Sequence, residues 1–422
     1  MHKTTLLKIL SLAVLPGVPG LYSQEPVQME EAIRQALANN KELSIARMEV
    51  ERAKSRLLWS GRLPNPELKL SGTLDTLGNG EGEHNFAVGI SQRYPRTTRL
   101  RAEKDLRLSQ VFLAEAEVLE HSRNLAATVA ETIVAIAASE SNMEHGREHA
   151  GLQRVILDTL EAQVARGEAS QLDLAQARLA LRHTEQRTRN FIANRNQHRL
   201  RLQQLLGLPP DTAFTLEYPL DLPPGLPESE IPEEAILRNR PDHLLAIHNT
   251  KVAGGALALE REKQRQGSTY SLFIEQERVS DEPVGLVDNT FVGFGVSIPL
   301  PIRQKNEGNI ALAEIGLEEA GLREDASRFN ILSQYKAAWQ LYKDNWETAQ
   351  AASGDILEAA HKNYDDSRIA YLDGQIGLLQ VQLAQEQLLE LEHESIEAIF
   401  RYHQSLVQLR KTTGKIIPAN LP

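Results

Sequence analysis

The chain has 422 residues, of which only 5% are aromatic and none is cysteine, and it carries a formal net charge of −11. Alanine, leucine, glutamate, glutamine and arginine dominate its middle regions, a composition typical of long packed helices rather than of a layered α/β core. Without cysteine, neither disulfide bonds nor a thioether-linked lipid anchor is expected. The negative charge and the lack of a basic stripe argue against a nucleic-acid partner.

Residues 1–23 have the pattern of a secretory signal peptide. Met1-His2-Lys3 supplies a basic start, and the apolar stretch from Leu6 to Val18 follows it, which is the order found in such peptides. Beyond residue 24 the sequence contains no apolar run of the roughly eighteen residues that a transmembrane helix needs. If the mature chain enters a membrane, it must therefore do so through β-strands.

The sequence repeats itself. Gly89-Ile90-Ser91 returns as Gly295-Val296-Ser297, Gly167 returns as Gly374, and Gly207 returns as Gly414. We predict a first structural repeat over 24–207, made of a helix, a β-hairpin at 67–95, a long helix at 96–166 and a return helix at 168–206. The second repeat, 232–414, has a helix, a β-hairpin at 268–301, a long helix at 303–373 and a return helix at 375–413. A proline-rich linker at 208–231 joins the repeats, and 415–422 form a C-terminal tail.

Both hairpins alternate apolar residues with polar or small ones, which predicts strands with one apolar face. Each strand has about ten residues, enough to cross a bilayer at the usual tilt. The opposite face carries mainly glycine, serine and alanine, which suits a lumen. A half-buried hairpin on a soluble core is the simpler alternative, but no other part of the sequence offers such a core. The residues expected to face lipid are Phe86, Val88, Ile90, Leu272, Ile274, Val292, Phe294 and Val296.

Four strands cannot close a barrel, and an open sheet edge is not tolerated in hydrocarbon. A membrane role therefore requires several chains to combine their hairpins. Two chains would supply only about eight strands, whereas three would supply about twelve and leave an open lumen. A pore therefore favours at least three chains.

Long segments without proline predict long helices. Neither 96–166 nor 303–373 contains proline, and each could run about 105 Å as a helix. The helices before the hairpins and the return helices together reach about the same length, so we expect each repeat to place one long helix beside two shorter ones stacked end to end. Pro241 should kink or restart the helix in which it falls. Apolar residues of the linker should pack on the outside of the helices, namely Phe214, Leu216 and Tyr218.

The return helices carry apolar seams. In the first return helix the seam is weak, because Thr184, Thr188 and Arg195 interrupt it. In the second return helix the spacing is that of a coiled coil, and the seam consists of Val381, Ala384, Leu388, Leu391, Ser395, Ala398, Tyr402, Leu406 and Leu409. Such seams indicate helix packing, which the wall of a tunnel requires.

Catalytic motifs are missing from the sequence. It contains no His-Glu-x-x-His, no phosphate-binding glycine loop and no nucleophile elbow. His145 and His149 lie four residues apart beside Glu144 and Glu148, a spacing that suits zinc or copper. A solvated helix face explains these residues more simply, so no metal site is assigned. We therefore expect neither an enzyme nor a cofactor.

Three segments, together with the doubled layout, resemble a known family. They are Leu63-Pro64-Asn65-Pro66-Glu67-Leu68 before the first strand, Val296-Ser297-Ile298-Pro299-Leu300-Pro301 at the end of the last strand, and Arg166-Gly167-Glu168-Ala169-Ser170-Gln171-Leu172-Asp173 between two helices. The chain resembles the TolC-type outer-membrane efflux proteins, and among them the cobalt–zinc–cadmium resistance branch. The resemblance implies a mainly α fold with a small β part: duplicated helical hairpins form a periplasmic tunnel, and a homotrimer shares a twelve-stranded barrel in the outer membrane of a Gram-negative bacterium.

The resemblance also implies a function. Such a protein is the passive exit duct of a tripartite efflux system, here with heavy-metal cations as candidate cargo. An adaptor protein and an inner-membrane pump of the resistance–nodulation–division type would deliver the cargo. The residues that match the adaptor-docking tips are Arg166, Gly167, Ser170, Leu172, Asp173, Gly374, Leu378 and Leu379. The alternative is a periplasmic coiled-coil scaffold or adaptor that never enters the membrane.

The chain departs from the family pattern near the second tip. Some relatives narrow the tunnel there with an acidic ring, but Gln380 and Leu383 stand at the comparable positions. Asp173 and Asp373 remain as candidates for a constriction, since charged rings select ions by their field. Ordinary solvated carboxylates explain these two residues equally well.

Overall fold

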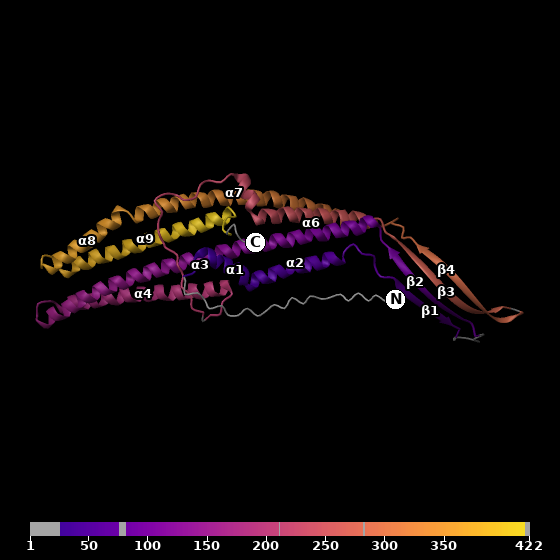
Figure 1. Cartoon of the computed structure of the whole chain (residues 1–422), viewed down its shortest axis with the longest axis horizontal. Helices are drawn as coiled ribbons and strands as arrows, with labels where there is room; N and C mark the ends of the chain where they lie inside the picture. Colours follow the sequence, from indigo (N-terminus) through magenta and orange to yellow (C-terminus); the bar gives the residue numbers. More distant parts are fainter. Residues whose placement is uncertain (1–25, 76–81, 211, 282, 418–422) are drawn as a thin grey trace, which may run out of the picture.

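The computed structural model describes residues 26–75, 82–210, 212–281 and 283–417. The expected signal peptide and most of the C-terminal tail lie outside these residues. The chain forms an elongated body in which helices occupy most of the length and four strands extend from one end (Figure 1). None of the helices in these residues is both long and apolar enough to cross a membrane.

The two halves of the chain have the same order of elements. The first half comprises α1 (Met29–Asn39), α2 (Lys41–Trp59), β1 (Glu67–Leu74), β2 (His84–Tyr94), α3 (Thr97–Ala165) and α4 (Gln171–Leu206). The second half comprises α5 (Glu233–Asn239), α6 (Pro241–Lys263), β3 (Ser268–Asp281), β4 (Gly285–Ser297), α7 (Glu307–Ala352), α8 (Asp355–Leu372) and α9 (Leu378–Thr412).

The duplication extends to the glycine that follows the last helix of each half. Gly207 follows α4 and Gly414 follows α9, and both have left-handed backbone conformations with φ of 69° and 74°. A Cβ atom on Gly207 would lie 2.6 Å from the carbonyl oxygen of Asn39, the last residue of α1. A Cβ atom on Gly414 would likewise overlap the carbonyl oxygen of Asn239, the last residue of α5. Each return helix therefore ends against the first helix of its own half, at a contact that excludes a side chain.

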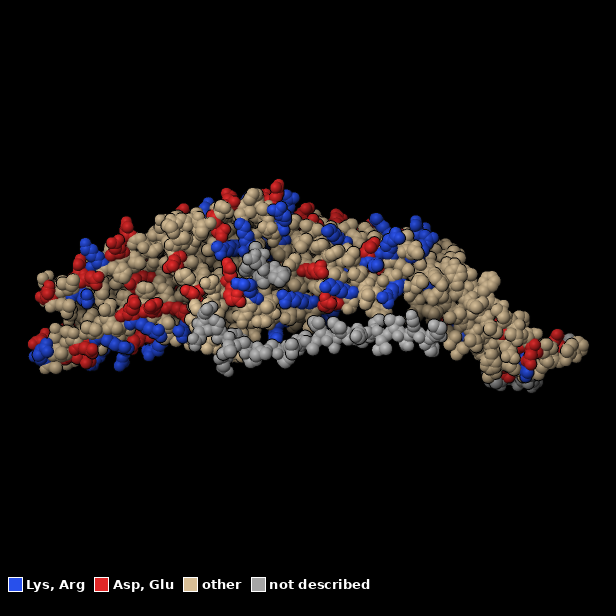
Figure 2. All heavy atoms as spheres, viewed as in Figure 1, with Lys and Arg blue, Asp and Glu red and all other residues tan. Residues whose placement is uncertain are grey.

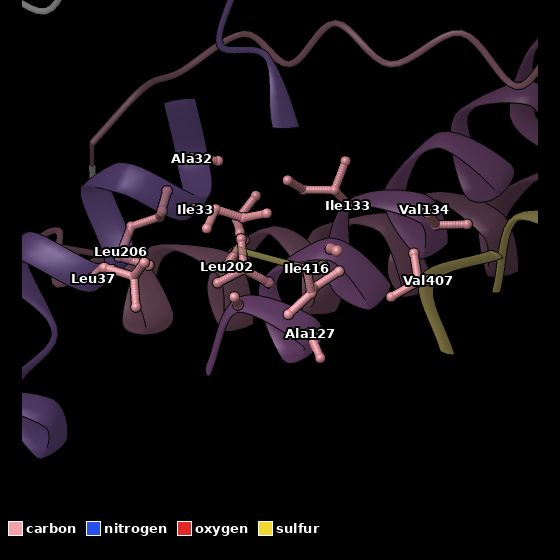
Figure 3. Packing of buried hydrophobic residues seen from close by; sticks show 14 of the residues in the cluster. Ala32, Ile33, Leu37, Ala127, Ile133, Val134, Leu202, Leu206, Val407 and Ile416 are labelled. Atoms are coloured by element: carbon pink, nitrogen blue, oxygen red, sulfur yellow. The ribbon is translucent and has the colours of Figure 1, made fainter. Parts of the chain in front are cut away.

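The helices share two main apolar cores. One joins α1, α3 and α4, with Ile33, Ile133 and Leu206 among its buried members (Figure 3). The other lies between α7 and α9 and includes Tyr342 and Tyr402. These cores hold the long helices side by side along the body.

Two packing predictions are confirmed. The linker side chains Phe214, Leu216 and Tyr218 pack against the first core, on the outside of the helices. The coiled-coil seam of α9 packs inward, because eight of its nine residues are buried and Leu391 packs against a buried cluster.

Two of the expected helices are interrupted. The sequence predicts one helix over 303–373, but α7 ends at Ala352 and α8 begins at Asp355. Gly354 between them has a non-helical conformation, with φ of −92° and ψ of −142°, and glycine is a poor helix former. The helix before the first hairpin is also divided, because the side chain of Asn40 accepts a hydrogen bond from the backbone N–H of Leu43 and caps α2. Pro241 is the first residue of α6, as a restarted helix requires.

The four strands form one antiparallel sheet in the order β1-β2-β3-β4. The register places Val88 opposite Ile274, and Ile274 opposite Val292. Within the described part of the chain, β1 and β4 each pair on one side only, so both outer edges of the sheet carry backbone groups available to another chain.

Candidate channel wall and helical tips

The outward face of the sheet is apolar and exposed. Phe294 is 83% exposed and Val292 is 73% exposed, although both are large side chains that proteins usually bury. The structure brings all eight candidate lipid-facing residues onto this one face, which we call the apolar band: Phe86, Val88, Ile90, Leu272, Ile274, Val292, Phe294 and Val296.

Polar and aromatic residues mark the two ends of the apolar band. At the helical end, the rings of Tyr94 and Tyr270 lie 5.6 Å apart. At the far end, the guanidinium of Arg278 donates two hydrogen bonds of 2.6 Å to the carboxylate of Asp288. Figure 2 shows that charged side chains cover the helical body but are nearly missing from the visible sheet surface until its far end. Transmembrane strands carry an apolar band flanked by aromatic residues, and here the aromatic pair stands at the helical end of the band.

The opposite face of the sheet, which we call the inner face, is lined mainly by small and polar residues. One row across the four strands consists of Lys69, Gly89, Phe273 and Gly293. Nearer the far end, the amide of Asn85 donates a hydrogen bond to the carboxylate of Glu275 across neighbouring strands. The two faces thus differ as the lipid side and the water side of a barrel wall do.

The helices next to the sheet expose further apolar residues that the sequence reasoning missed. On α7, Ile315, Leu322 and Phe329 follow one another at intervals of seven residues, so they lie on one side of the helix. All three are exposed, as is Leu312 one turn before them, and we call these four residues the α7 stripe. Large exposed apolar stripes mark surfaces that another molecule covers.

The helix α2 also exposes apolar side chains. Ile45 and Met48 are 62% and 63% exposed, and Leu58 and Trp59 at the end of the helix are exposed as well. Both helices on which these residues lie lead directly toward the sheet (Figure 1). The part of the body next to the sheet therefore offers apolar contacts on two different helices.

The two helical turns lie together at the end of the molecule opposite the sheet (Figure 1). Gly167 lies in the turn between α3 and α4, and Gly374 in the turn between α8 and α9, with φ of 76° and 73°. Left-handed values of this kind favour glycine. Ser170 caps α4, because its hydroxyl accepts a hydrogen bond of 3.1 Å from the backbone N–H of Leu172.

The candidate tip residues differ in accessibility. Leu172 and Leu379 are exposed, and Arg166 pairs with Glu168 across the first turn. Leu378, in contrast, is only 5% exposed, and it packs in a cluster with three residues of the first tip, Leu160, Leu174 and Ala177. Leu378 therefore joins the two tips to each other rather than offering a surface to a partner.

The two candidate constriction residues lie at different tips. Asp173 is in the first turn of α4, and Asp373 follows the last residue of α8. Burial raises the pKa of Tyr371 on α8, and the nearby Asp173 carboxylate raises that pKa further. Asp173 therefore faces the second tip from the first.

Gln380, which stands where some relatives are expected to carry an acidic residue, has a local role. Its side chain accepts a hydrogen bond from the N–H of Gly377 and so caps α9.

We expected His145 and His149 to lie on a solvated helix face. This expectation is wrong for His149, which is buried. Its Nε2 atom lies 2.6 Å from Oε2 of Glu392 on α9. His145 Nδ1 lies 3.8 Å from the same oxygen, and His361 Nε2 lies 3.4 Å from the other. Among the residues that the structure describes, no group of three or more ligating side chains is arranged to hold a metal ion.

Comparisons with known proteins agree with this geometry. Residues 32–208 match the family described as outer membrane efflux protein. The cobalt-zinc-cadmium resistance protein CzcC of Cupriavidus metallidurans is 22% identical over 394 residues, which cover 92% of this chain and 90% of CzcC. The expected resemblance to outer-membrane efflux proteins is confirmed.

Solved structures share the fold. CusC superposes with a TM-score of 0.76 at 19% identity, covering 93% of this chain and 95% of CusC. The CmeC outer membrane channel of Campylobacter jejuni gives a TM-score of 0.75 at 17% identity, covering 93% of this chain and 87% of CmeC. The expected fold class, long helices with a small antiparallel sheet, is therefore confirmed.

Proposed function

We propose that this chain, which resembles the outer membrane efflux proteins, is the outer-membrane channel of a tripartite efflux system in a Gram-negative bacterium. The apolar band carries this proposal. Its eight large apolar side chains share one exposed face of a four-stranded sheet, and a lipid bilayer is the environment that stabilises such a surface.

The open sheet edges support a trimer. In hydrocarbon the edge groups of β1 and β4 need partners, and three chains would combine their strands into a twelve-stranded barrel with an open lumen. The α7 stripe and the exposed apolar residues of α2 lie on the helices next to the sheet. In the trimer they would be covered by neighbouring chains, so that the helices continue the barrel as a tunnel.

The tips support docking of an adaptor and a pump. They lie at the end of the body farthest from the sheet (Figure 1), which is the periplasmic end if the sheet lies in the outer membrane. The duct is passive, and the energy for transport comes from the inner-membrane pump, of the resistance–nodulation–division type. Because one relative is named for cobalt, zinc and cadmium resistance, heavy-metal cations are the proposed cargo.

The proposal is tested by placing a charge in the apolar band. Val292→Arg should prevent insertion, because Val292 lies midway between the aromatic rim and the charged rim, and an arginine facing lipid near the bilayer midplane costs about 2–4 kcal/mol per chain. The control is Thr290→Arg on the same face, nearer the charged rim, where the cost falls to about 0–1 kcal/mol. The measurements are recovery in the outer-membrane fraction and conductance in planar bilayers.

The outcomes separate the two functions. An outer-membrane channel gives a wild-type oligomer that conducts, a Thr290→Arg variant that inserts and a Val292→Arg variant that does not. A periplasmic scaffold would leave the location of Val292→Arg unchanged. A soluble wild-type monomer would also contradict the channel.

A further inference from the structure

Phe273 is an exception among the small residues at the middle of the inner face. It lies on β3 directly between Gly89 on β2 and Gly293 on β4. Phe291 also lies on this face, but its partner across the strands is Glu275, and its side chain is 46% exposed. Phe273 is less exposed than Phe291, and the two neighbouring glycines explain the difference.

The ring of Phe273 occupies the space that a side chain at position 293 would fill. A Cβ atom on Gly293 would lie 2.7 Å from Cε2 and 2.9 Å from Cε1 of the ring, and closer still to Cζ. On the other side, a Cβ atom on Gly89 would lie 2.8 Å from the Cβ of Phe273. The ring therefore leans along the sheet over Gly293, whereas strand side chains usually stand roughly perpendicular to the sheet.

We infer that Gly293 positions Phe273 flat against the wall, and that this arrangement sets the open width of the lumen at this level. The inference rests on the proposed trimeric barrel, in which three copies of the ring lie at the same height. If the rings stood upright, all three would project into the lumen. The resistances of successive levels of a pore add, so a narrower lumen at this level lowers the conductance of the whole channel. The glycine at 293 keeps this level open.

The test is Gly293→Ala, which removes the space over which the ring lies. The displaced ring should lower the single-channel conductance, with trimers still formed. The matched control is Gly295→Ala on the same strand and face. A Cβ atom there meets only the hydroxyl of Ser271, which can rotate away, so its conductance should equal that of the wild type.

A second substitution identifies the ring as the cause. The double variant Phe273→Ala with Gly293→Ala should conduct at least as well as the wild type, because no ring is left to be displaced. Phe273→Ala alone should admit larger polyethylene glycols into the pore than the wild type does. Equal conductance of Gly293→Ala and Gly295→Ala, or no recovery in the double variant, would overturn the inference.

The proposed function and the inference fail differently. If the wild-type protein forms no conducting trimer, the channel itself is wrong. If the wild type conducts but Gly293→Ala does not assemble, the polymer measurement on Phe273→Ala decides, and an unchanged size limit overturns the role of the ring.

Discussion

The Nε2 atom of His149 lies 2.6 Å from Oε2 of Glu392, and both side chains are almost fully buried. His149 belongs to α3 and Glu392 to α9, so this contact ties the first half of the chain to the second. Burial by itself raises the pKa of Glu392, but the hydrogen bond from His149 and the nearby histidines lower it, and the resulting pKa lies below the ordinary value of 4.5. The folded protein therefore favours the ionised carboxylate.

This contact predicts a loss of stability in acid. Because the folded-state pKa of Glu392 is depressed, its stabilisation is fully present above pH 4.5 and is lost as the pH falls through the lower folded-state pKa. Glu392→Gln should reduce the free energy of unfolding by about 1–3 kcal/mol at neutral pH. The difference from the wild type should shrink as the pH falls through this depressed pKa, because the wild-type carboxyl then becomes neutral as well.

Thermal unfolding of detergent-solubilised protein, followed by circular dichroism from pH 3 to 7, measures this difference. The control is Glu390→Gln, an exposed residue of the same helix, which should unfold like the wild type. A difference for Glu392→Gln that stays constant over the whole pH range would contradict the assigned charge state.

A second prediction concerns the glycines that close the two halves. Gly414→Ala should destabilise the chain, because alanine is strained at φ of 74° and its Cβ would overlap the carbonyl oxygen of Asn239. Strain of this kind costs about 1–3 kcal/mol, and Gly207→Ala should behave alike. Gly151→Ala is the control: it lies within α3 with open space around it, and a helical alanine gains roughly 0.5–1 kcal/mol. Equal melting temperatures for Gly414→Ala and Gly151→Ala would count against the close contact.

Local patterns in the sequence predicted the elements well. The doubled glycines, the alternating strands and the seam of α9 each depend on neighbouring residues, and the structure has all of them. The weak seam of α4 was underestimated, because Thr184 and Thr188 are buried in it. Thr188 fits there since it faces Gly146 on α3, where a Cβ atom would overlap its hydroxyl. A contact between two helices of this kind depends on both partners and is not visible in either sequence segment alone.

Contacts between distant residues could not be predicted. His149 and Glu392 are 243 positions apart, and only the packing of α3 on α9 brings them together. The break at Gly354 was missed because the surrounding residues favour a helix and no proline marks the site. The α7 stripe is not visible in the sequence as a subunit contact, because apolar residues on one side of a helix usually pack within their own chain.

A third prediction concerns this α7 stripe. Phe329→Asp should weaken trimer formation, because in the proposed trimer it would bury a charge without a partner, which is strongly unfavourable. Phe329→Leu keeps the stripe apolar and is the control. Trimer content after detergent extraction, measured by light scattering, tests the pair. If Phe329→Asp forms trimers as readily as Phe329→Leu, then this side of α7 does not lie between subunits.

The last prediction concerns the tips. At Gly167, where φ is 76°, a Cβ atom meets nothing within 4 Å, so a substitution acts through backbone strain rather than through a clash. Valine should be strained there by about 1–3 kcal/mol and distort the turn, whereas asparagine tolerates the left-handed conformation. Gly167→Val should therefore impair efflux while the trimer still forms, and Gly167→Asn should resemble the wild type. The measurement is tolerance of a deletion strain, complemented with each variant, to zinc, cobalt and cadmium salts. Normal tolerance with Gly167→Val, and with the equivalent Gly374→Val, would show that the adaptor does not depend on the shape of these turns.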